Sequence, residues 1–573
     1  MRVVLPFFLL LLCFINELNA QKNTDNDSFT SPLKPPFLFS GNFGELRQSH
    51  FHSGLDYRTQ GRTGLPVFAV KEGYISRIGI SPSGYGNALY MNHPDGITSV
   101  YGHLERFSDK LQDYIKEKQY GRESFSININ LSKDEFNFEQ GEIIAWSGNS
   151  GSSGGPHLHF EIRDTKSERV YNPIFYNSGI KDNSPPKIIA IYVYPLTTNS
   201  NVGENHTKKR LETVSVPDGY RLKNNQPIQL YGKIGFGIQS DDYFSGIGLK
   251  CGIYSATLFC DGKKVFGFKM DNFSFEDSRF ANSQSDYEEY ILSHRWIQRL
   301  FKQPGNDLDI YEPADMNGIL NLDDGKGHEF EIIVCDALGN KTSLKFRTSS
   351  KKSQSQSKKQ DFTKEFFFGQ SNVFENDKIK IDLPKGALYD NLDFVWKSSP
   401  KLSGCFSEIQ QVHSRLTPLQ KPYSLAIKCD GLPEELRDKA LIVSVAPTTG
   451  QKSSIGGEYS AGWVTVKTSI FGSFAVVVDK TPPVITPLSI KDKKTLTDNK
   501  KVQFRITDDL SGIKSYRGEI DGMWVLFEYD AKAQLINYTF DKNRMAFGKS
   551  HLLRLVVTDN KENKTEYKAI IYK

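Results

Sequence analysis

Residues 148–162 form a Gly/Ser-rich segment that leads directly into an alternating run of apolar and polar residues. From Pro156 onward, His157, His159 and Glu161 alternate with apolar side chains, which predicts a β-strand with one apolar and one polar face. Two imidazoles that alternate along a strand lie about 6–7 Å apart on the same face. One histidine is then able to hold a metal ion while its neighbour reaches a reacting group, and the small loop residues leave room for an extended substrate. Two solvated histidines on a strand face are the simpler alternative.

The other histidines of this region favour the metal interpretation. Six of the eleven histidines lie between His50 and His159, and the other five are scattered over the rest of the chain. His52 and Asp56, with Gly54 between them, suit two ligands contributed from one bend, and His159 is able to supply a third. Catalytic zinc takes three nitrogen or oxygen ligands and keeps one position for water, and binding lowers the pKa of that water from about 15.7 to about 7.

His103 and His157 remain as imidazoles that do not bind the metal. Such groups shuttle protons or stabilise an oxyanion in hydrolytic sites. A ligand set of histidine and carboxylate without a thiolate is the type expected of hydrolytic rather than structural zinc. His93 lies beside Pro94 at the tip of an expected hairpin, and we interpret it as an exposed turn residue.

The segments around these histidines predict an antiparallel β domain with one inserted helix, spanning residues 35–180. A turn at residues 94–96 joins two of its strands into a hairpin. The expected strands cover residues 67–70, 74–78, 87–92, 97–103, 125–131 and 142–146, and the expected helix covers residues 108–119.

Three motifs of this domain together resemble the signatures of the lysostaphin/LytM-type zinc metallopeptidases, peptidase family M23. They are His52-x-Gly-x-Asp56, Tyr101-Gly102-His103-Leu104 and Gly155-Pro156-His157-Leu158-His159-Phe160, in the family's order. The resemblance covers roughly residues 40–175. It implies that His52, Asp56 and His159 bind Zn²⁺ and that His103 and His157 are the catalytic histidines. The implied substrate is a peptide crosslink of bacterial peptidoglycan.

Three further points concern the choice of ligand, an insertion and the catalytic competence of the domain. His50 forms a His-x-His pair of its own with His52, but the four-residue spacing of the family motif selects His52 as the ligand. Residues 106–140 are inserted relative to the compact members of the family, and this insertion is expected to reshape one wall of the groove. Some relatives have lost ligands and act as wall-binding or scaffold proteins. All five expected positions are present here, which favours an active enzyme.

The N-terminus predicts export. Residues 1–20 contain Arg2, an apolar run from Val3 to Ile15 and a polar stretch ending at Ala20, the layout of a secretory signal peptide. No later segment approaches the 18 or so apolar residues of a membrane-spanning helix. The mature protein is therefore expected in the periplasm or outside the cell, without a transmembrane segment.

Charge and cysteine content add little about partners. The chain carries 72 basic and 67 acidic residues, a near balance that neither requires nor excludes nucleic acid, and no nucleic-acid partner is predicted. The five cysteines beyond the signal peptide form no Cys-x-x-Cys pair. A Cys405–Cys429 disulfide is permitted in an exported protein, but their odd number defines no framework.

Most of the chain lies after the histidine-rich domain and predicts three β-sandwich-like modules. Residues 181–347 are expected to form an enlarged immunoglobulin-like domain, residues 362–480 a different β-rich domain, and residues 481–573 a second immunoglobulin-like domain. The polar, low-complexity residues 348–361 between the first two are interpreted as a flexible linker.

The two immunoglobulin-like modules share weak internal repeats. Each begins with a double proline before an apolar strand, and each contains a paired aspartate, an Asp-Gly turn and a later Asp-containing strand end. The corresponding segments are Pro185-Pro186 and Pro482-Pro483, Asp241-Asp242 and Asp508-Asp509, Asp261-Gly262 and Asp521-Gly522, and Asp336 and Asp559. Turn and strand-end roles explain the aspartates most simply, and calcium binding is the alternative.

Residues 181–573 contain no cluster of side chains that predicts catalysis. We expect these modules to position or restrain the peptidase, so that a fragment of roughly residues 30–180 keeps its zinc and its activity. The alternative is that the first module packs against the groove and completes or blocks it, which the short connection between Ser178 and Pro186 allows.

Overall fold

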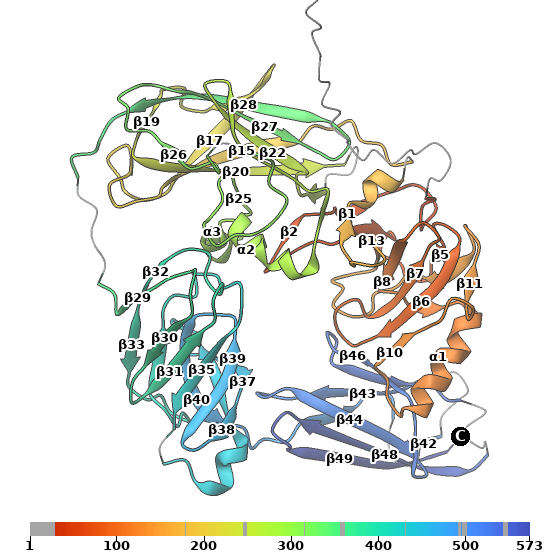
Figure 1. Cartoon of the computed structure of the whole chain (residues 1–573). Coiled ribbons are helices and arrows are strands. Elements are labelled where there is room, and N and C mark those ends of the chain that lie inside the picture. The colour runs from red at the N-terminus through yellow and green to blue at the C-terminus, as the bar shows by residue number, and fades with distance from the viewer. Residues whose placement is uncertain are drawn as a thin grey trace, which may run out of the picture.

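The computed structural model describes residues 29–572 apart from residues 178, 245–248, 315, 356–360, 430, 491–493, 496–500 and 542–547. Strands dominate the described chain and the helices are short, which confirms the expected mainly β fold class. None of the described helices is both long and apolar enough to cross a membrane. The expected signal peptide lies outside the described residues. Figure 1 shows four β-rich bodies arranged as a ring, from the orange N-terminal domain to the blue C-terminal module.

The N-terminal domain is built on an antiparallel sheet with the strand order β1-β4-β13-β8-β7-β6-β10. These strands are β1 (Phe39–Gly41), β4 (Leu55–Arg58), β13 (His157–Asp164), β8 (Ile97–Gly102), β7 (Asn87–Asn92), β6 (Gly73–Ile80) and β10 (Ile127–Asn130). Pairing on the sheet continues through β11 (Asn137–Phe138) and β14 (Val170–Tyr171), and a smaller sheet contains β5 (Pro66–Phe68), β12 (Ile143–Trp146) and β9 (Arg106–Phe107). Buried apolar residues of both sheets form one hydrophobic cluster.

Strand β13 lies at the centre of this domain, as the alternation in its sequence predicts. It pairs with β4 and β8, which places His159 opposite Asp56 on one side and opposite Gly102 on the other. Leu158 and Ile162 on its second face are fully buried in the domain core. The polar face of β13 therefore lies beside the residues of two other motifs.

Most expected strands of the domain form, and two that are neighbours in the sequence lie in different sheets. The hairpin of β7 and β8 is present, with Gly96 in its turn at φ +78°. The segments predicted at residues 67–70 and 74–78 become β5 and the longer β6, but they lie in different sheets. The short segment between them crosses from one sheet to the other, because β5 pairs with β12 whereas β6 pairs with β7, β10 and β11.

The inserted helix is α1 (Asp109–Gly121), close to the predicted residues 108–119. Leu111 and Ile115 bury its apolar face in the domain core. Its other face is turned toward the C-terminal module (Figure 1).

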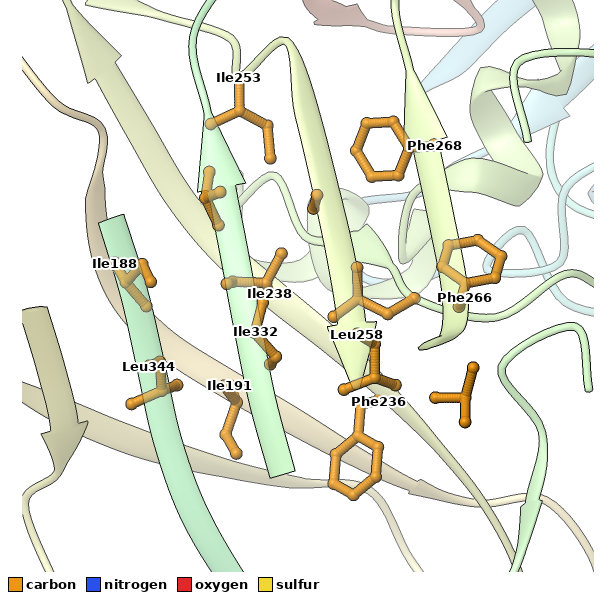
Figure 2. Packing of buried hydrophobic residues seen from close by; sticks show 14 of the residues in the cluster. Ile188, Ile191, Phe236, Ile238, Ile253, Leu258, Phe266, Phe268, Ile332 and Leu344 are labelled. Atoms are coloured by element: carbon orange, nitrogen blue, oxygen red, sulfur yellow. The ribbon is translucent and has the colours of Figure 1, made fainter. Parts of the chain in front are cut away.

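The first module forms a β-sandwich over the region predicted for it. Figure 2 shows its core, in which Ile188 and Phe236 pack with Leu258, Ile332 and Leu344. Its strands are β15 (Lys187–Pro195), β16 (Asn201–Val202), β17 (Lys209–Val216), β18 (Gly219–Leu222), β19 (Ile228–Tyr231), β20 (Lys233–Tyr243), β21 (Lys250–Cys251), β22 (Ser255–Cys260), β23 (Lys263–Lys269), β24 (Asn272–Phe273), β25 (Gln298–Arg299), β26 (Leu320–Asn321), β27 (Glu329–Cys335) and β28 (Lys341–Ser350). The helical turns are η1 (Pro173–Tyr176), which precedes the module, and η2 (Phe275–Phe280), α2 (Ala281–Gln284) and α3 (Tyr287–Ser293) in its enlarged segment.

The N-terminal domain and the first module share a hydrophobic core. Phe43, Leu46, Phe51 and Val170 of the N-terminal domain lie in the same cluster as the sandwich core. Strand β14 of the first domain pairs with β24 of the module. Part of the apolar surface of residues 30–180 is therefore buried by the next module, and whether a fragment of these residues keeps its zinc and activity stays a prediction.

The predicted flexible linker at residues 348–361 is also partly wrong. Residues 348–350 complete β28, and Ser353 is buried, with its backbone N–H donated to Asn201 Oδ1 at 2.9 Å. Ser355 Oγ donates to the Glu204 carbonyl at 2.7 Å. These hydrogen bonds fix the segment to the sandwich, and residues 356–360 lie outside the described residues.

The third body contains two sheets of the orders β30-β31-β35-β39-β38 and β33-β34-β40-β36-β37. Its elements are β29 (Lys364–Phe366), β30 (Asn372–Glu375), β31 (Ile379–Leu383), β32 (Leu392–Phe394), β33 (Trp396–Ser399), β34 (Ile409–Val412), β35 (Tyr423–Lys428), η3 (Glu434–Lys439), β36 (Ala440–Val445), β37 (Lys452–Gly456), β38 (Glu458–Ser460), β39 (Trp463–Thr468) and β40 (Gly472–Val478). Cys405 and Cys429 are both buried here, and the described residues contain no disulfide between them.

The C-terminal module has the same turn hydrogen bonds as the first module. The Asp261 carboxylate accepts the Glu329 backbone N–H at 2.8 Å, and the Asp521 carboxylate accepts the Leu552 N–H at 2.8 Å. The strands of this module are β41 (Val484–Pro487), β42 (Lys494–Thr495), β43 (Val502–Thr507), β44 (Ile513–Ile520), β45 (Met523–Trp524), β46 (Phe527–Asp530), β47 (Leu535–Tyr538), β48 (Ser550–Asp559) and β49 (Lys564–Tyr572). The shared turn contacts support the internal repeat seen in the sequence.

The C-terminal module returns to the N-terminal domain and closes the ring (Figure 1). Lys116 of α1 forms an ion pair with Asp541 at 2.7 Å, and the rings of Tyr120 and Trp524 are 5.1 Å apart, edge to face. Lys532 contacts the glycine-rich loop before β13, where its ammonium group donates to the Asn149 carbonyl. The inserted helix is thus a contact surface between two bodies.

Candidate metal centre

Three side chains from two strands and one bend meet at the polar face of β13. His52 Nε2 lies 3.0 Å from Asp56 Oδ1 and 3.1 Å from His159 Nδ1, and the last two atoms are 2.9 Å apart. All three residues are buried. Ligand atoms around a tetrahedral zinc with bonds of about 2.0–2.1 Å lie about 3.3 Å apart. Two ring nitrogens and a carboxylate oxygen in this arrangement fit a metal ion of that kind.

Hydrogen bonds on the far side of each ring decide which nitrogen faces the centre. His52 Nδ1 is bonded to the Asn42 carbonyl at 2.8 Å, which leaves Nε2 for the metal. His159 Nε2 is bonded to Glu161 Oε1 at 2.8 Å, which leaves Nδ1. Such outer partners fix the tautomer of a metal-binding histidine and orient its ring.

The charges around the centre favour an ionised ligand carboxylate. Burial by itself raises the pKa of Asp56, but His52, His157 and His159 hold it well below its usual value. The same balance applies to Glu161, whose pKa is lowered despite complete burial, chiefly by the Arg163 guanidinium. A cation is therefore attracted to a site whose carboxylates are already charged.

His103 and His157 lie beside the three ligand candidates and are held in a single orientation. His103 Nδ1 is bonded to the Ser150 carbonyl at 2.9 Å, and His157 Nδ1 to the Gly155 carbonyl at 2.8 Å. Their rings are 4.7 Å apart, and His157 Nε2 lies 3.4 Å from Asp56 Oδ1. Both imidazoles therefore present Nε2 as the nitrogen free for proton transfer. Burial, together with the neighbouring histidines, lowers the pKa of His103 to about 3, so its ring is neutral.

Glycines let the backbone come close at two places in this centre. A Cβ atom on Gly54 would lie 2.2 Å from the Phe160 carbonyl oxygen, so the bend between His52 and Asp56 tolerates only glycine against β13. In the loop before β13, a Cβ on Gly151 would lie 2.3 Å from the Gly86 nitrogen. The room expected for a substrate therefore lies at Gly154 and Gly155, where a Cβ would meet open space.

The other two histidines of this region, His50 and His93, lie away from the site. His50 is exposed, and its Nδ1 is bonded to the Gln48 carbonyl at 2.9 Å on the hairpin of β2 (Leu46–Arg47) and β3 (His50–Phe51). The prediction that His93 is an exposed turn residue is wrong. His93 is buried because its ring bonds the Glu72 carbonyl and Ser99 Oγ, each at 2.8 Å, and packs edge-on against Phe29.

Sequence reasoning missed the residues that support the ligands from outside. Asn42 and Tyr85 come from loops far from the three motifs, and no local pattern marks them. Tyr85 donates its hydroxyl hydrogen to Glu161 at 2.6 Å. The alternation of β13 did place Glu161 on the same face as His159, which was the available signal.

Two family models match the chain. Residues 50–120 match the model described as peptidase family M23, and residues 363–479 match the model described as a Zu5-like domain. The chain is 34% identical over 118 residues to the DD-carboxypeptidase/endopeptidase Mpg of Neisseria meningitidis serogroup B, covering 21% of each protein. It is 32% identical over 135 residues to lysostaphin of Staphylococcus staphylolyticus, covering 23% of this chain and 21% of lysostaphin.

The chain therefore spans about a fifth of the length of these curated relatives, 21% in both cases. Among solved structures, the catalytic domain of lysostaphin from Staphylococcus simulans is 25% identical and aligns 24% of this chain with 90% of that domain at a TM-score of 0.19.

The fold and the site define a β domain that presents two histidines and an aspartate able to bind a metal ion. Over residues 50–120 this domain matches the model of peptidase family M23, and it is similar to the two curated relatives named above.

Proposed function

We propose that this chain is an exported zinc metalloendopeptidase that hydrolyses peptide crosslinks of bacterial peptidoglycan. The observation that carries the proposal is the meeting of His52 Nε2, Asp56 Oδ1 and His159 Nδ1, none more than 3.1 Å from the next, beside two orientated imidazoles. The match of residues 50–120 to the model of peptidase family M23 supports the reaction class. Export rests on the predicted signal peptide at residues 1–20.

His52, Asp56 and His159 hold the Zn²⁺ ion in this proposal, and Asn42 and Glu161 orient the two ligand rings. When bound, zinc acts as a Lewis acid on the scissile carbonyl and lowers the pKa of its water to about 7. Glu161 stays ionised beside Arg163, so it keeps the proton of His159 on Nε2 and leaves Nδ1 as the ligand atom.

His103 and His157 act on the substrate. Their Nδ1 atoms donate to backbone carbonyls, so each Nε2 is able to accept a proton from the attacking water and to return one to the leaving amine. A protonated Nε2 also donates a hydrogen bond to the oxyanion that forms at the scissile carbonyl. The open space at Gly154 and Gly155 admits the peptide beside His157.

The test compares His157→Ala and His159→Ala in the full-length protein. His159→Ala should lose zinc and activity together, because a ligand is gone. His157→Ala should keep one zinc and lose about 10²–10⁴-fold in activity, since only proton transfer or an oxyanion contact is removed. Zinc content is measured by elemental analysis, and cleavage is measured on crosslinked peptidoglycan peptides.

Two results would contradict the assignment. Full zinc occupancy in His159→Ala, or loss of zinc from His157→Ala, would exchange or remove the proposed roles. Zinc-loaded wild-type protein that binds cell walls without cleaving any crosslink would instead favour the non-catalytic wall-binding or scaffold alternative.

A further inference from the structure

Three buried carboxylates meet in the first module, and none of them belongs to the proposed zinc centre. Asp182 precedes β15, Asp242 lies in β20, and Asp336 follows β27. One oxygen of each lies within 4.8 Å of the others. Their exposed fractions are 8%, 2% and 5%, so the cluster is enclosed by protein.

Asp242 is the member of this cluster whose carboxylate is incompletely bonded. Its Oδ1 is buried and has no hydrogen-bond partner among the described residues. Neither Asp242 nor Asp336 forms an ion pair with a lysine or arginine within the described part of the chain, and the nearby Lys250 is paired with Asp241 at 2.7 Å instead. A buried carboxylate oxygen without a donor or a countercharge is costly.

Another buried carboxylate of the same module, Asp286, has both a cationic partner and a hydrogen-bond donor. Asp286 is also 2% exposed, but it accepts the Lys208 ammonium at 3.0 Å and the Tyr194 hydroxyl at 2.9 Å. Burial and the neighbouring Asp336, in contrast, raise the pKa of Asp242 to about 7. Among the described residues, Asp242 therefore lacks the lysine partner that Asp286 has.

We propose that Asp182, Asp242 and Asp336 hold a Ca²⁺ ion. The candidate ligands are all oxygens, which excludes the nitrogen and sulfur sets that zinc prefers. Calcium accepts several carboxylates in irregular geometry, whereas magnesium demands a near-ideal octahedron and usually keeps several waters. Three converging carboxylates in an enclosed site therefore favour calcium.

The calcium would stabilise the joint between the module and the peptidase domain. Asp242 pairs with Cys251 across β20 and β21. The next residue, Gly252, exchanges two hydrogen bonds with the Asn42 side chain, at 2.6 and 2.8 Å. Asn42 in turn holds the ring of His52. An ion at this strand end would fix the segment on which the outer shell of the zinc centre rests.

The C-terminal module contains a related group, which supplies a control. Asp479, Asp508 and Asp509 also bring one oxygen each within 4.8 Å. Asp509 is exposed, and Asp479 Oδ2 accepts the Ser511 N–H at 3.0 Å. We limit the proposal to the first cluster because only there are all three carboxylates buried.

The experiment measures calcium binding and thermal unfolding of the full-length protein after chelation and reloading with zinc. We expect one Ca²⁺ per chain by titration calorimetry. At about 1 mM Ca²⁺, a concentration typical of extracellular sites, the unfolding midpoint should rise by about 3 °C or more, and Mg²⁺ should not reproduce the shift. Asp242→Asn should abolish both signals, and Asp509→Asn should leave both unchanged.

The outcomes distinguish a bound calcium ion from a proton shared between two carboxylates of the cluster. If a proton bridges Asp242 and Asp336, wild-type protein binds no calcium, and the proposal fails. It also fails if Asp242→Asn binds calcium like the wild type, or if magnesium gives the same shift. Asp242→Asn removes repulsion and should be at least as stable as the calcium-free wild type, and Asp336→Asn gives a second test should it fold poorly. None of these readouts depends on peptidase activity.

Discussion

Asn42 links the first module to the proposed zinc ligand His52 through its side chain and its backbone carbonyl. Its side-chain amide exchanges hydrogen bonds with Gly252 of the first module, and its carbonyl accepts the hydrogen on Nδ1 of His52. Asn42 touches neither the substrate space nor the metal position directly. It is a positioning residue, since it sets the ring orientation of a proposed ligand.

We predict that Asn42→Ala lowers zinc affinity by about tenfold, the lower end of the effect of an outer partner of a metal ligand. The substitution keeps the backbone carbonyl that bonds His52 Nδ1 but removes the side-chain hydrogen bonds to Gly252 that hold this carbonyl in place. Competition with a chromophoric chelator measures the affinity. Asn137→Ala, at an exposed position in the same domain, is the matched control and should bind zinc like the wild type. Equal zinc affinity in Asn42→Ala and wild type would show that His52 needs no support from the module.

At the scale of elements, the loop before β13 depends on close contact between two backbones. Gly151 has a φ of +68° and lies against Gly86, whose φ is +66°. The loop also carries Ser150, whose carbonyl orients His103. On its outer side, Lys532 of the C-terminal module donates to the Asn149 carbonyl. A small shift of the loop therefore moves a proposed catalytic imidazole.

We predict that Gly151→Ala destabilises the loop and lowers peptidase activity at least about tenfold. An alanine with this left-handed backbone costs about 1–2 kcal/mol even before its Cβ meets the Gly86 backbone. Gly121→Ala at the end of α1 is the control, because a Cβ there meets open space, its backbone is not left-handed and it lies outside the proposed substrate space. Thermal unfolding and crosslink cleavage are measured for both variants. Equal losses in the two variants would mean that the close contact at Gly151 is not the cause.

At the scale of the whole molecule, the N-terminal domain and the first module share one hydrophobic core. Phe43, Leu46, Phe51 and Val170 complete the sandwich core from the other domain. Burying a side chain of this size contributes about 1.5–3 kcal/mol. Four of them together are comparable with the about 5–15 kcal/mol net stability of a typical domain.

We predict that a fragment of residues 29–180 does not fold stably, whereas a fragment of residues 29–355 does. The shorter fragment leaves those four apolar side chains and one edge of β14 in water. Amide dispersion in NMR spectra and zinc content after dialysis distinguish the two fragments. If residues 29–180 give a dispersed spectrum and retain one zinc, the shared core is dispensable and the modules are spacers as the sequence suggested.

Structural features that depend on a few neighbouring residues were predictable from the sequence. The alternation at residues 157–162 predicted β13 and its two faces, and the spacing of His52 and Asp56 predicted two groups at one bend. The structure brings these residues together with His103, as the three motifs implied, although their chemical roles stay predictions. The reason is that strand periodicity and motif spacing depend only on local backbone geometry.

Features that depend on residues far apart in the sequence were decided by tertiary structure alone. The burial of His93, the link from Gly252 through Asn42 to His52 and the shared core each join segments that no local pattern relates. The sequence indicated turn and strand-end roles for Asp242 and Asp336, and only the fold shows that they are buried together with Asp182. Local pattern determines which face of a strand is apolar, but packing decides which distant surface covers it and which charges remain without a partner.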